Sequence, residues 1–418
     1  MHPVKFGIGQ PHVRVEDPAL LTGRGRFVAD AIPAGALRAV VVRSPHAHAR
    51  FRFRDLAPAR ELPGVRLVLT AGDIANLGPM PCAGTIEPKN EKEMWVPRFP
   101  VLADGVVRHV GDAVACVVAD MLDQAKDAVE AIEIDWEPLP AVADVRAAAA
   151  PGAPLVWAER PGNIAFLCEL GDEAATARAF AAAWRVVKLE LVNQRLVTNY
   201  IETRGVVAEF DRASGLTLTL ASQGSHTIRD SLADDVLKIP RARLRVVTGD
   251  VGGGFGTKTA PYREYALAAV AAERLGRTVA WIADRSEHFL GDSQGRDNFT
   301  VAEMALDGDG RFLALRVDTL ANLGAYLAFY GPFIPWIGAT VLTGVYRIPA
   351  LHARIRGVYS HTVPVDAYRG AGRPEAAYVI ERLVDAVARE TGETPDAVRN
   401  RNFIRAADMP YKTATRRT

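Results

Sequence analysis

A glycine-rich run between a predicted strand and a predicted helix constrains this chain more than any other feature. Residues 249–259 read GDVGGGFGTKT, with a strand-like run at 244–248 and helical apolar spacing over 262–275. Because glycine has no Cβ, four glycines within five residues indicate a turn that lets a ligand lie close to the main chain. The amides of such a turn are suited to hold an oxygen-rich, anionic group.

Two nucleotide-binding motifs come close to this run without matching it. The phosphate-loop pattern, counted from Gly252, places Lys258 and Thr259 correctly but finds Thr257 where its second glycine belongs. The dinucleotide pattern also needs a glycine at position 257. Three interpretations of the run therefore stay open: a cofactor loop, a variant phosphate loop, and a tight turn that binds nothing.

Length and composition narrow the class of protein. A chain of 418 residues is long enough for two or three domains. With 49% hydrophobic residues, 24% charged residues and a net charge of +1, it is typical of soluble globular proteins and favours neither nucleic acid nor a membrane as partner. No secretory signal and no apolar run of membrane-spanning length is visible.

The cysteines predict the compartment. Cys82, Cys116 and Cys168 are widely separated and form neither a metal-ligand pair nor a disulfide framework. This pattern is typical of a reducing environment, so we expect a cytoplasmic protein.

Helical and strand periodicities alternate along the chain and predict an α+β fold. We expect a first domain with an N-terminal arm over residues 1–145, an Ala-, Gly- and Pro-rich linker over 146–162, and a second domain over 163–418. A long helix is expected to begin at Pro374, because proline is favoured in the first turn of a helix.

Four stretches carry the chemistry, and each is weak alone. They are IETRG at 201–205, ASQGSH at 221–226, the glycine-rich run, and VDAYRGAGRPE at 365–375. Taken alone, Gln223 is better explained as a strand-end cap and Arg369 as a salt-bridge partner.

In this order the four stretches resemble the molybdopterin-binding subunit of the xanthine oxidase family of molybdenum hydroxylases. That family includes aldehyde oxidoreductases and aerobic carbon monoxide dehydrogenase. VGDAVA at 110–115 and EPLPAV at 137–142 resemble its N-terminal α/β hammerhead domain. The resemblance covers nearly the whole chain and implies a hammerhead domain followed by the first molybdopterin-binding domain.

The resemblance assigns roles to matching residues. Arg369 and Gln223 would be catalytic: Arg369 would stabilise charge on the substrate oxygen, and Gln223 would donate a hydrogen bond to an oxygen ligand of molybdenum. Lys258 is at least as well explained as a solvated residue at the start of the helix. The implied cofactor-binding residues are Gln223, Gly253, Gly254, Phe255, Gly256 and Arg369.

The resemblance also implies a cofactor and partner chains. The cofactor would be molybdenum on molybdopterin in its cytosine dinucleotide form, with the metal held through the pterin and by no side chain directly. Since the three cysteines do not suit an iron–sulfur cluster, the clusters and FAD are expected on separate iron–sulfur and FAD subunits.

Departures from the family pattern narrow the substrate. The carbon monoxide enzyme has a cysteine where Gly370 stands, and xanthine oxidase has a glutamate and an arginine where Thr259 and Ile337 stand. We therefore expect a small molecule, either an aldehyde or an N-heteroaromatic compound, hydroxylated with oxygen from water. The expected pocket residues are Thr259, Tyr330, Phe333, Ile337, Gly370 and Ala371.

The end of the chain departs most from the pattern. Family members continue into a second cofactor-binding domain, where a Gly-x-Gly-Glu run supplies the catalytic glutamate, and no such run occurs here. The expectation is half of a split subunit, completed by a second chain, or a truncated product. Two alternatives stay open: a non-catalytic remnant that binds partner chains, and a phosphate-loop nucleotide binder.

Overall fold

The structure is a computed structural model that describes residues 13–89, 91 and 93–415. The expected N-terminal arm lies partly outside these residues, and its described part carries helix α1 (Asp17–Leu21) and the 3-10 turn η1 (Val28–Ala31). In the described part of the chain, every helix is too short or too polar to cross a membrane.

A seven-stranded sheet contains strands from both sides of the expected domain boundary. Its order is β11 (Leu244–Val247), β10 (Gly215–Leu220), β9 (Gly205–Asp211), β12 (Val279–Ile282), β1 (Leu37–Arg43), β5 (Ala113–Ala119) and β3 (Val65–Thr70). Strand β1 pairs in parallel with β12, with Leu37 opposite Val279. Hydrogen bonding in this sheet therefore crosses the expected boundary near residue 145, because β1, β3 and β5 lie before it and the other four strands lie after it.

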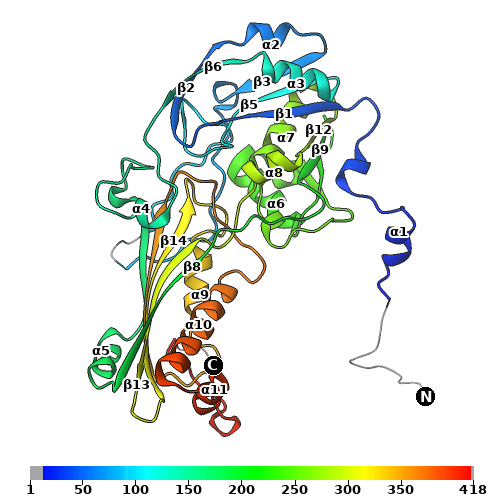
Figure 1. The fold of residues 1–418 in the computed structure, drawn as a ribbon. Coiled ribbons are helices and arrows are strands. Elements are labelled where there is room, and N and C mark those ends of the chain that lie inside the picture. Colours follow the sequence, from blue (N-terminus) through cyan, green and yellow to red (C-terminus); the bar gives the residue numbers. More distant parts are fainter. Residues whose placement is uncertain (1–12, 90, 92, 416–418) are drawn as a thin grey trace, which may run out of the picture.

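Helices cover this sheet and a smaller one beside it (Figure 1). Helix α7 (Arg263–Leu275) packs on β9 and β12, and α6 (Ser225–Ser231) packs near β11. A three-stranded sheet of β4 (Val106–Val107), β2 (Ala49–Asp55) and β6 (Glu133–Pro138) lies beside α2 (Ala57–Glu61) and α3 (Leu122–Glu130).

A five-stranded sheet extends away from these elements, as the lower half of Figure 1 shows. Its order is β7 (Ile164–Gly171), β15 (Ala350–Tyr359), β14 (Phe312–Gly324), β13 (Asn298–Leu306) and β8 (Arg185–Asn193). Helix α10 (Arg373–Thr391) packs on β8 and β13, whereas α5 (Glu173–Ala181) packs on β14 and β15. The remaining helices are α4 (Val145–Ala148), α8 (Arg285–Gly291), α9 (Phe333–Ala339) and α11 (Pro395–Asn402).

The α+β prediction is confirmed. Strand β11 and helix α7 flank the glycine-rich run as predicted, and α10 has Pro374 in its first turn and ends at Gly392, whose φ is 72°. Strand β14, the longest at 13 residues, was missed. It is buried on both faces over its second half, so its sequence lacks the alternation that marks a half-exposed strand.

The segment expected as a linker, residues 146–162, packs against the rest of the protein at several points. Val145, Ala148 and Val156 are buried, and the indole of Trp157 donates to the carbonyl of Ala325 at 2.8 Å. The side chain of the buried Asn163 accepts from the amide of Val156 at 2.9 Å. Composition alone does not reveal these contacts, because alanine and proline are equally suited to a loop that lies on a surface.

Asp112, within the hammerhead-like motif, ties the first part of the chain to the second. Its Oδ1 accepts from Nη1 of Arg263 on α7 at 2.6 Å, and its Oδ2 accepts from the hydroxyl of Tyr326 at 3.0 Å. All three side chains are buried. Burial by itself raises the pKa of Asp112, but neighbouring His109 and Arg263 outweigh it and hold the pKa below its usual range.

His109, fully buried beside Asp112, predicts a pH dependence of stability. Burial lowers the pKa of its ring to about 4, against 6.5 for an unperturbed histidine. Between these pH values the unfolded chain binds a proton at His109 that the folded chain does not. The unfolding free energy is therefore unaffected by this group above pH 6.5 and decreases as the pH falls from 6.5 toward 4. The full shift is worth on the order of 3 kcal/mol.

We expect His109→Gln to flatten the slope of unfolding free energy against pH in this window, measured by denaturant titration at several pH values. His226→Gln, which changes an exposed histidine, is the matched control. An unchanged slope in His109→Gln would show that another group causes the acid sensitivity.

Candidate functional site

Close packing demands glycine at two positions of the glycine loop, which we define as residues 249–259. At Gly256 φ is 105°, and a Cβ there would lie 2.8 Å from the carbonyl oxygen of Ala367. A Cβ on Gly254 would lie 2.5 Å from Oε1 of Gln223. The loop is thus pressed against the end of β10 on one side and residues 366–368 on the other.

Gln223 follows β10 and is bound to the loop by both its backbone and its side chain. Its amide donates to the carbonyl of Lys258 at 3.0 Å, and its Oε1 accepts from the amide of Gly256 at 2.8 Å. The side chain is exposed, and its Nε2 has no hydrogen-bond partner among the described residues. One end of the amide is therefore fixed while its donor end faces out.

Arg369 lies on a tight turn, residues 368–372, which we call the arginine turn. Its amide donates to the carbonyl of Phe255 at 2.8 Å, and its guanidinium carbon lies 5.6 Å from the centroid of the exposed Phe255 ring. Gly370, Ala371 and Gly372 all have positive φ. The exposed guanidinium has no ion pair or hydrogen bond with any described residue.

The expected pocket residues lie at different distances from this centre. Buried Asp366, whose pKa burial raises to about 6, accepts from the amides of Tyr330 at 3.0 Å and Ala367 at 2.7 Å, which places Tyr330 next to the segment that leads into the arginine turn. Thr259 donates its amide to Gly256 at 3.2 Å. Ile337 is half-buried on α9.

Phe333, also on α9, faces a different hollow. Its ring lies 5.3 Å from that of Trp336, and the two line an open hollow with Thr85, Ile86 and Lys89. The start of α9 nevertheless touches the arginine turn, since a Cβ on Gly372 would lie 2.3 Å from the carbonyl oxygen of Ile334.

Lys258 is buried, so its interpretation as a solvated residue is wrong. Its Nζ donates to the carbonyl of Glu202 at 2.8 Å and to Oε2 of the same residue at 3.1 Å, and lies 4.4 Å from the ring centroid of Tyr200. Burial lowers its pKa, and Glu202 opposes that shift. A phosphate loop needs this cation free for the nucleotide, and here it is committed inside the protein.

Glu202 holds the glycine loop from beneath and was missed as a functional residue. Its Oε2 accepts from the amide of Gly252 at 2.8 Å, and its Oε1 from the amide of Val28 at 3.2 Å. Its stretch, residues 201–205, stood out in the sequence, but nothing local shows that this carboxylate reaches a loop about fifty residues away.

Several hydrogen-bond donors of the site have no acceptor within the described ranges. They are Nε2 of the exposed Gln223, the guanidinium of the exposed Arg369 and the amides of Phe255, Gly253 and the buried Gly254. Such a set fits a group rich in anionic oxygen, as a pterin dinucleotide with its metal-bound oxygens is.

Among the described residues, one cluster has metal-ligand types, Glu169, Glu173 and His352, and it lies at the five-stranded sheet. Glu169 is already paired with Lys89 at 2.5 Å and His352 at 3.2 Å. The candidate site is the glycine loop with Gln223 and Arg369, where donors without acceptors gather.

The chain matches two families of known domains. Residues 156–403 match the molybdopterin cofactor-binding domain, and residues 22–140 match the aldehyde oxidase and xanthine dehydrogenase a/b hammerhead domain. The carbon monoxide dehydrogenase large chain of Hydrogenophaga pseudoflava is 35% identical over 95% of this chain and 50% of its own length. The nicotinate dehydrogenase large molybdopterin subunit of Eubacterium barkeri is 28% identical over 98% of this chain and 91% of its own length.

A solved structure has the same fold. Quinoline 2-oxidoreductase from Pseudomonas putida 86 superposes with a TM-score of 0.90 at 36% identity, over 98% of this chain and 52% of that chain. The chain thus spans about half the length of most relatives that it resembles, but nearly the full length of the Eubacterium subunit.

Proposed function

The chain belongs to the aldehyde oxidase and xanthine dehydrogenase family of molybdopterin-binding subunits, and from this premise we propose that it forms part of a molybdenum hydroxylase. In this proposal the assembled enzyme hydroxylates an N-heteroaromatic compound or an aldehyde, and the added oxygen comes from water. Molybdenum on molybdopterin, in the cytosine dinucleotide form, supplies the two-electron oxidation when it is bound.

One observation carries the proposal: three segments converge on a face made of unpaired donors. Gln223, the glycine loop and Arg369 are joined by the hydrogen bonds from Gly256 to Gln223 and from Arg369 to Phe255, both 2.8 Å. The side chains of Gln223 and Arg369 are exposed, and their remaining donors have no partner within the described residues. This supports a cofactor held by the amides of the loop and by Gln223.

Arg369 is proposed to act on the substrate. A guanidinium at this place stabilises negative charge that grows on the substrate oxygen, which fixed donors do best in a site that excludes water. The Phe255 ring, 40% exposed and beside the guanidinium, removes water from one side of it. Gln223 holds its donor toward the cofactor because its Oε1 is committed to Gly256.

The substrate class is proposed from what the pocket lacks. Gly370 offers no thiol, and Thr259 and Ile337 offer neither a carboxylate nor a guanidinium to pair with a purine. Two of the relatives reported above are named for N-heteroaromatic compounds, quinoline and nicotinate. These points support an N-heteroaromatic or aldehyde substrate over carbon monoxide or xanthine.

Partners and compartment are part of the same proposal. A second chain with a Gly-x-Gly-Glu run would add the glutamate base, and iron–sulfur and FAD subunits would carry electrons away. The Eubacterium relative, of similar length and named as one molybdopterin subunit, supports this division. Burial raises the pKa of the thiols of Cys82, Cys116 and Cys168 to about 12, and their lack of disulfides supports a cytoplasmic location.

Metal and substrate analysis of the assembled complex tests the proposal. We expect the chain, co-expressed with its companion chain and subunits, to contain molybdenum and to release a cytosine-containing pterin nucleotide, detected by mass spectrometry. Anaerobic mixing should reduce the enzyme with N-heteroaromatics or aldehydes faster than with carbon monoxide or xanthine.

Each contrary result favours a different alternative. A stable complex without molybdenum indicates a non-catalytic partner-binding chain. Tightly bound nucleotide without metal indicates a nucleotide binder. Xanthine turnover as fast as the best aldehyde or N-heteroaromatic would overturn the substrate class.

A further inference from the structure

A buried ion pair lies directly beneath the arginine turn and has no role in the function proposed above. Arg296 precedes β13, and Glu375 stands in the first turn of α10. Nη1 of Arg296 donates to Oε1 of Glu375 at 2.9 Å, and the two residues are only 8% and 7% exposed. A buried ion pair contributes little net stability, because removing both charges from water costs about as much as their attraction gains. Stability alone therefore does not explain why this pair is present.

The other contacts of Arg296 all go to the backbone and ring of the arginine turn. Its Nη2 donates to the carbonyl of Arg369 at 2.7 Å, and its Nη1 lies 3.4 Å from the carbonyl of Tyr368. Its guanidinium carbon lies 4.9 Å from the centroid of the Tyr368 ring. One planar guanidinium thus bonds a carboxylate and two successive carbonyls, which a lysine ammonium does not reproduce.

The backbone around Arg296 is shaped for this contact. Arg296 and Asp297 have φ values of 66° and 72°, a conformation that non-glycine residues rarely adopt. A Cβ on Gly295 would lie 2.5 Å from Cβ of Tyr368, so the two segments are in direct contact. Gly295 and Leu196 exchange backbone hydrogen bonds of 2.9 and 3.0 Å, which holds this segment in place.

Arg369 is consequently held on both sides by its backbone and not by its side chain. Its amide donates to Phe255 at 2.8 Å and its carbonyl accepts from Arg296 at 2.7 Å, whereas its guanidinium has no partner among the described residues. We propose that Arg296 and Glu375 form a positioning pair that fixes where the Arg369 guanidinium is presented. The role of Arg369 in the reaction rests on the proposed function. The hydrogen bonds that hold its backbone do not depend on that function.

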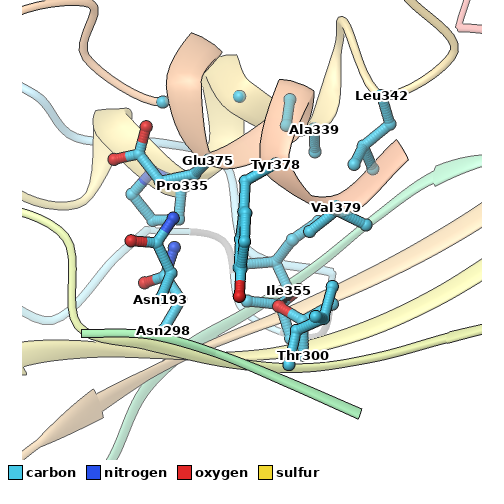
Figure 2. Close-up of a pocket in the computed structure, with 15 residues that line it drawn as sticks. Asn193, Asn298, Thr300, Pro335, Ala339, Leu342, Ile355, Glu375, Tyr378 and Val379 are labelled. Atoms are coloured by element: carbon cyan, nitrogen blue, oxygen red, sulfur yellow. Dashed lines mark hydrogen bonds between the residues drawn. The ribbon is translucent and has the colours of Figure 1, made fainter. Parts of the chain in front are cut away.

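A small cavity accounts for the unused oxygen of Glu375. Its Oε2 is buried and has no partner in the described part of the chain, and Glu375 lines a cavity of about 30 Å³ together with Asn193 and Asn298 (Figure 2). A cavity of this size has space for about two water molecules. One oxygen of Glu375 is thus bound by Arg296, and the other borders a space that is large enough for water.

Two variants in the assembled complex separate positioning from fold support. Arg296→Met leaves Glu375 as an uncompensated buried charge, so loss of thermal stability is expected. Arg296→Met/Glu375→Gln removes both charges and should regain most of that stability. In the double variant, hydrogen exchange at the Arg369 amide should still be several-fold faster than in wild type. Molybdenum content should be unchanged. The rate of substrate reduction should fall by roughly ten- to a hundredfold, because the guanidinium is displaced.

The matched control is Arg399→Met/Glu381→Gln, which removes another ion pair that involves α10, at 2.6 Å, away from the arginine turn. It should alter neither exchange at Arg369 nor rate. Wild-type exchange at Arg369 in the Arg296→Met/Glu375→Gln variant, or failure of that variant to fold, would overturn the proposal. Hydrogen exchange needs no turnover, so if the proposed function fails, the exchange result still decides whether the pair clamps the turn.

Discussion

Arg369→Met in the assembled enzyme is expected to lower the rate of substrate reduction by about a hundred- to a thousandfold, or ~3–4 kcal/mol, the usual cost of one preorganised donor. Methionine retains length and apolar packing but removes the charge and all guanidinium donors. Because the guanidinium has no partner among the described residues, its loss leaves no buried group unpaired. The effect should therefore fall on turnover and leave molybdenum content and thermal stability unchanged.

Two comparisons make this expectation specific. Gln223→Ala removes a group bound to the glycine loop at 2.8 Å, so it should lower molybdenum content. Arg382→Met, at an exposed position on α10, should change neither rate nor metal. The charge-stabilising role is wrong if Arg369→Met keeps full metal and a near wild-type rate. Loss of molybdenum in Arg369→Met would instead make Arg369 an anchor of the cofactor.

Arg204→Met is expected to cost about 3–5 kcal/mol of folding free energy, because it leaves buried carboxylates without their ion-pair partner. Arg204 is fully buried and donates to Asp292 at 2.7 Å and to Glu264 at 2.9 Å, while its guanidinium lies 3.7 Å from the ring centroid of Tyr262. Although burial alone raises the pKa of Glu264, Arg204 and Arg43 outweigh it and hold that pKa well below its usual range. Domains are stable by only about 5–15 kcal/mol, so this variant should be close to unfolding.

Chemical denaturation of the purified complex measures the effect. Arg66→Met removes an exposed arginine paired with Asp120 and should shift the transition little, because water screens that pair. Equal midpoints for Arg204→Met and Arg66→Met would contradict the assigned cost. The loss should also loosen the glycine loop, since Asp292 accepts from the hydroxyl of Tyr200, whose Cβ lies against Gly253.

Much of the fold was predictable because its elements are specified locally. The apolar spacing after the glycine loop predicted α7, and Pro374 marked the start of α10. Strands buried on both faces, such as much of β14, lack such a local signal.

The candidate site was predictable only as a set of segments. The order of the four stretches indicated the family, which the domain matches bear out. How their residues meet was not visible: Glu202 supports the glycine loop, Lys258 is buried, and Phe333 lines another hollow. The individual roles of Gln223, Arg369 and the pocket residues remain predictions for the experiments above.

By itself the sequence determined the local elements, the glycine loop between β11 and α7, and the family, because these depend on short-range spacing and on motif order. Only the tertiary structure decided which charges are buried and which remain free. Arg204, Arg296 and Arg369 are the same residue type, yet the first two are buried in ion pairs and the third is exposed. The carboxylates that bind Arg204 and Arg296 lie 60 to 88 residues away in sequence, so their pairing follows from how sheets and helices pack.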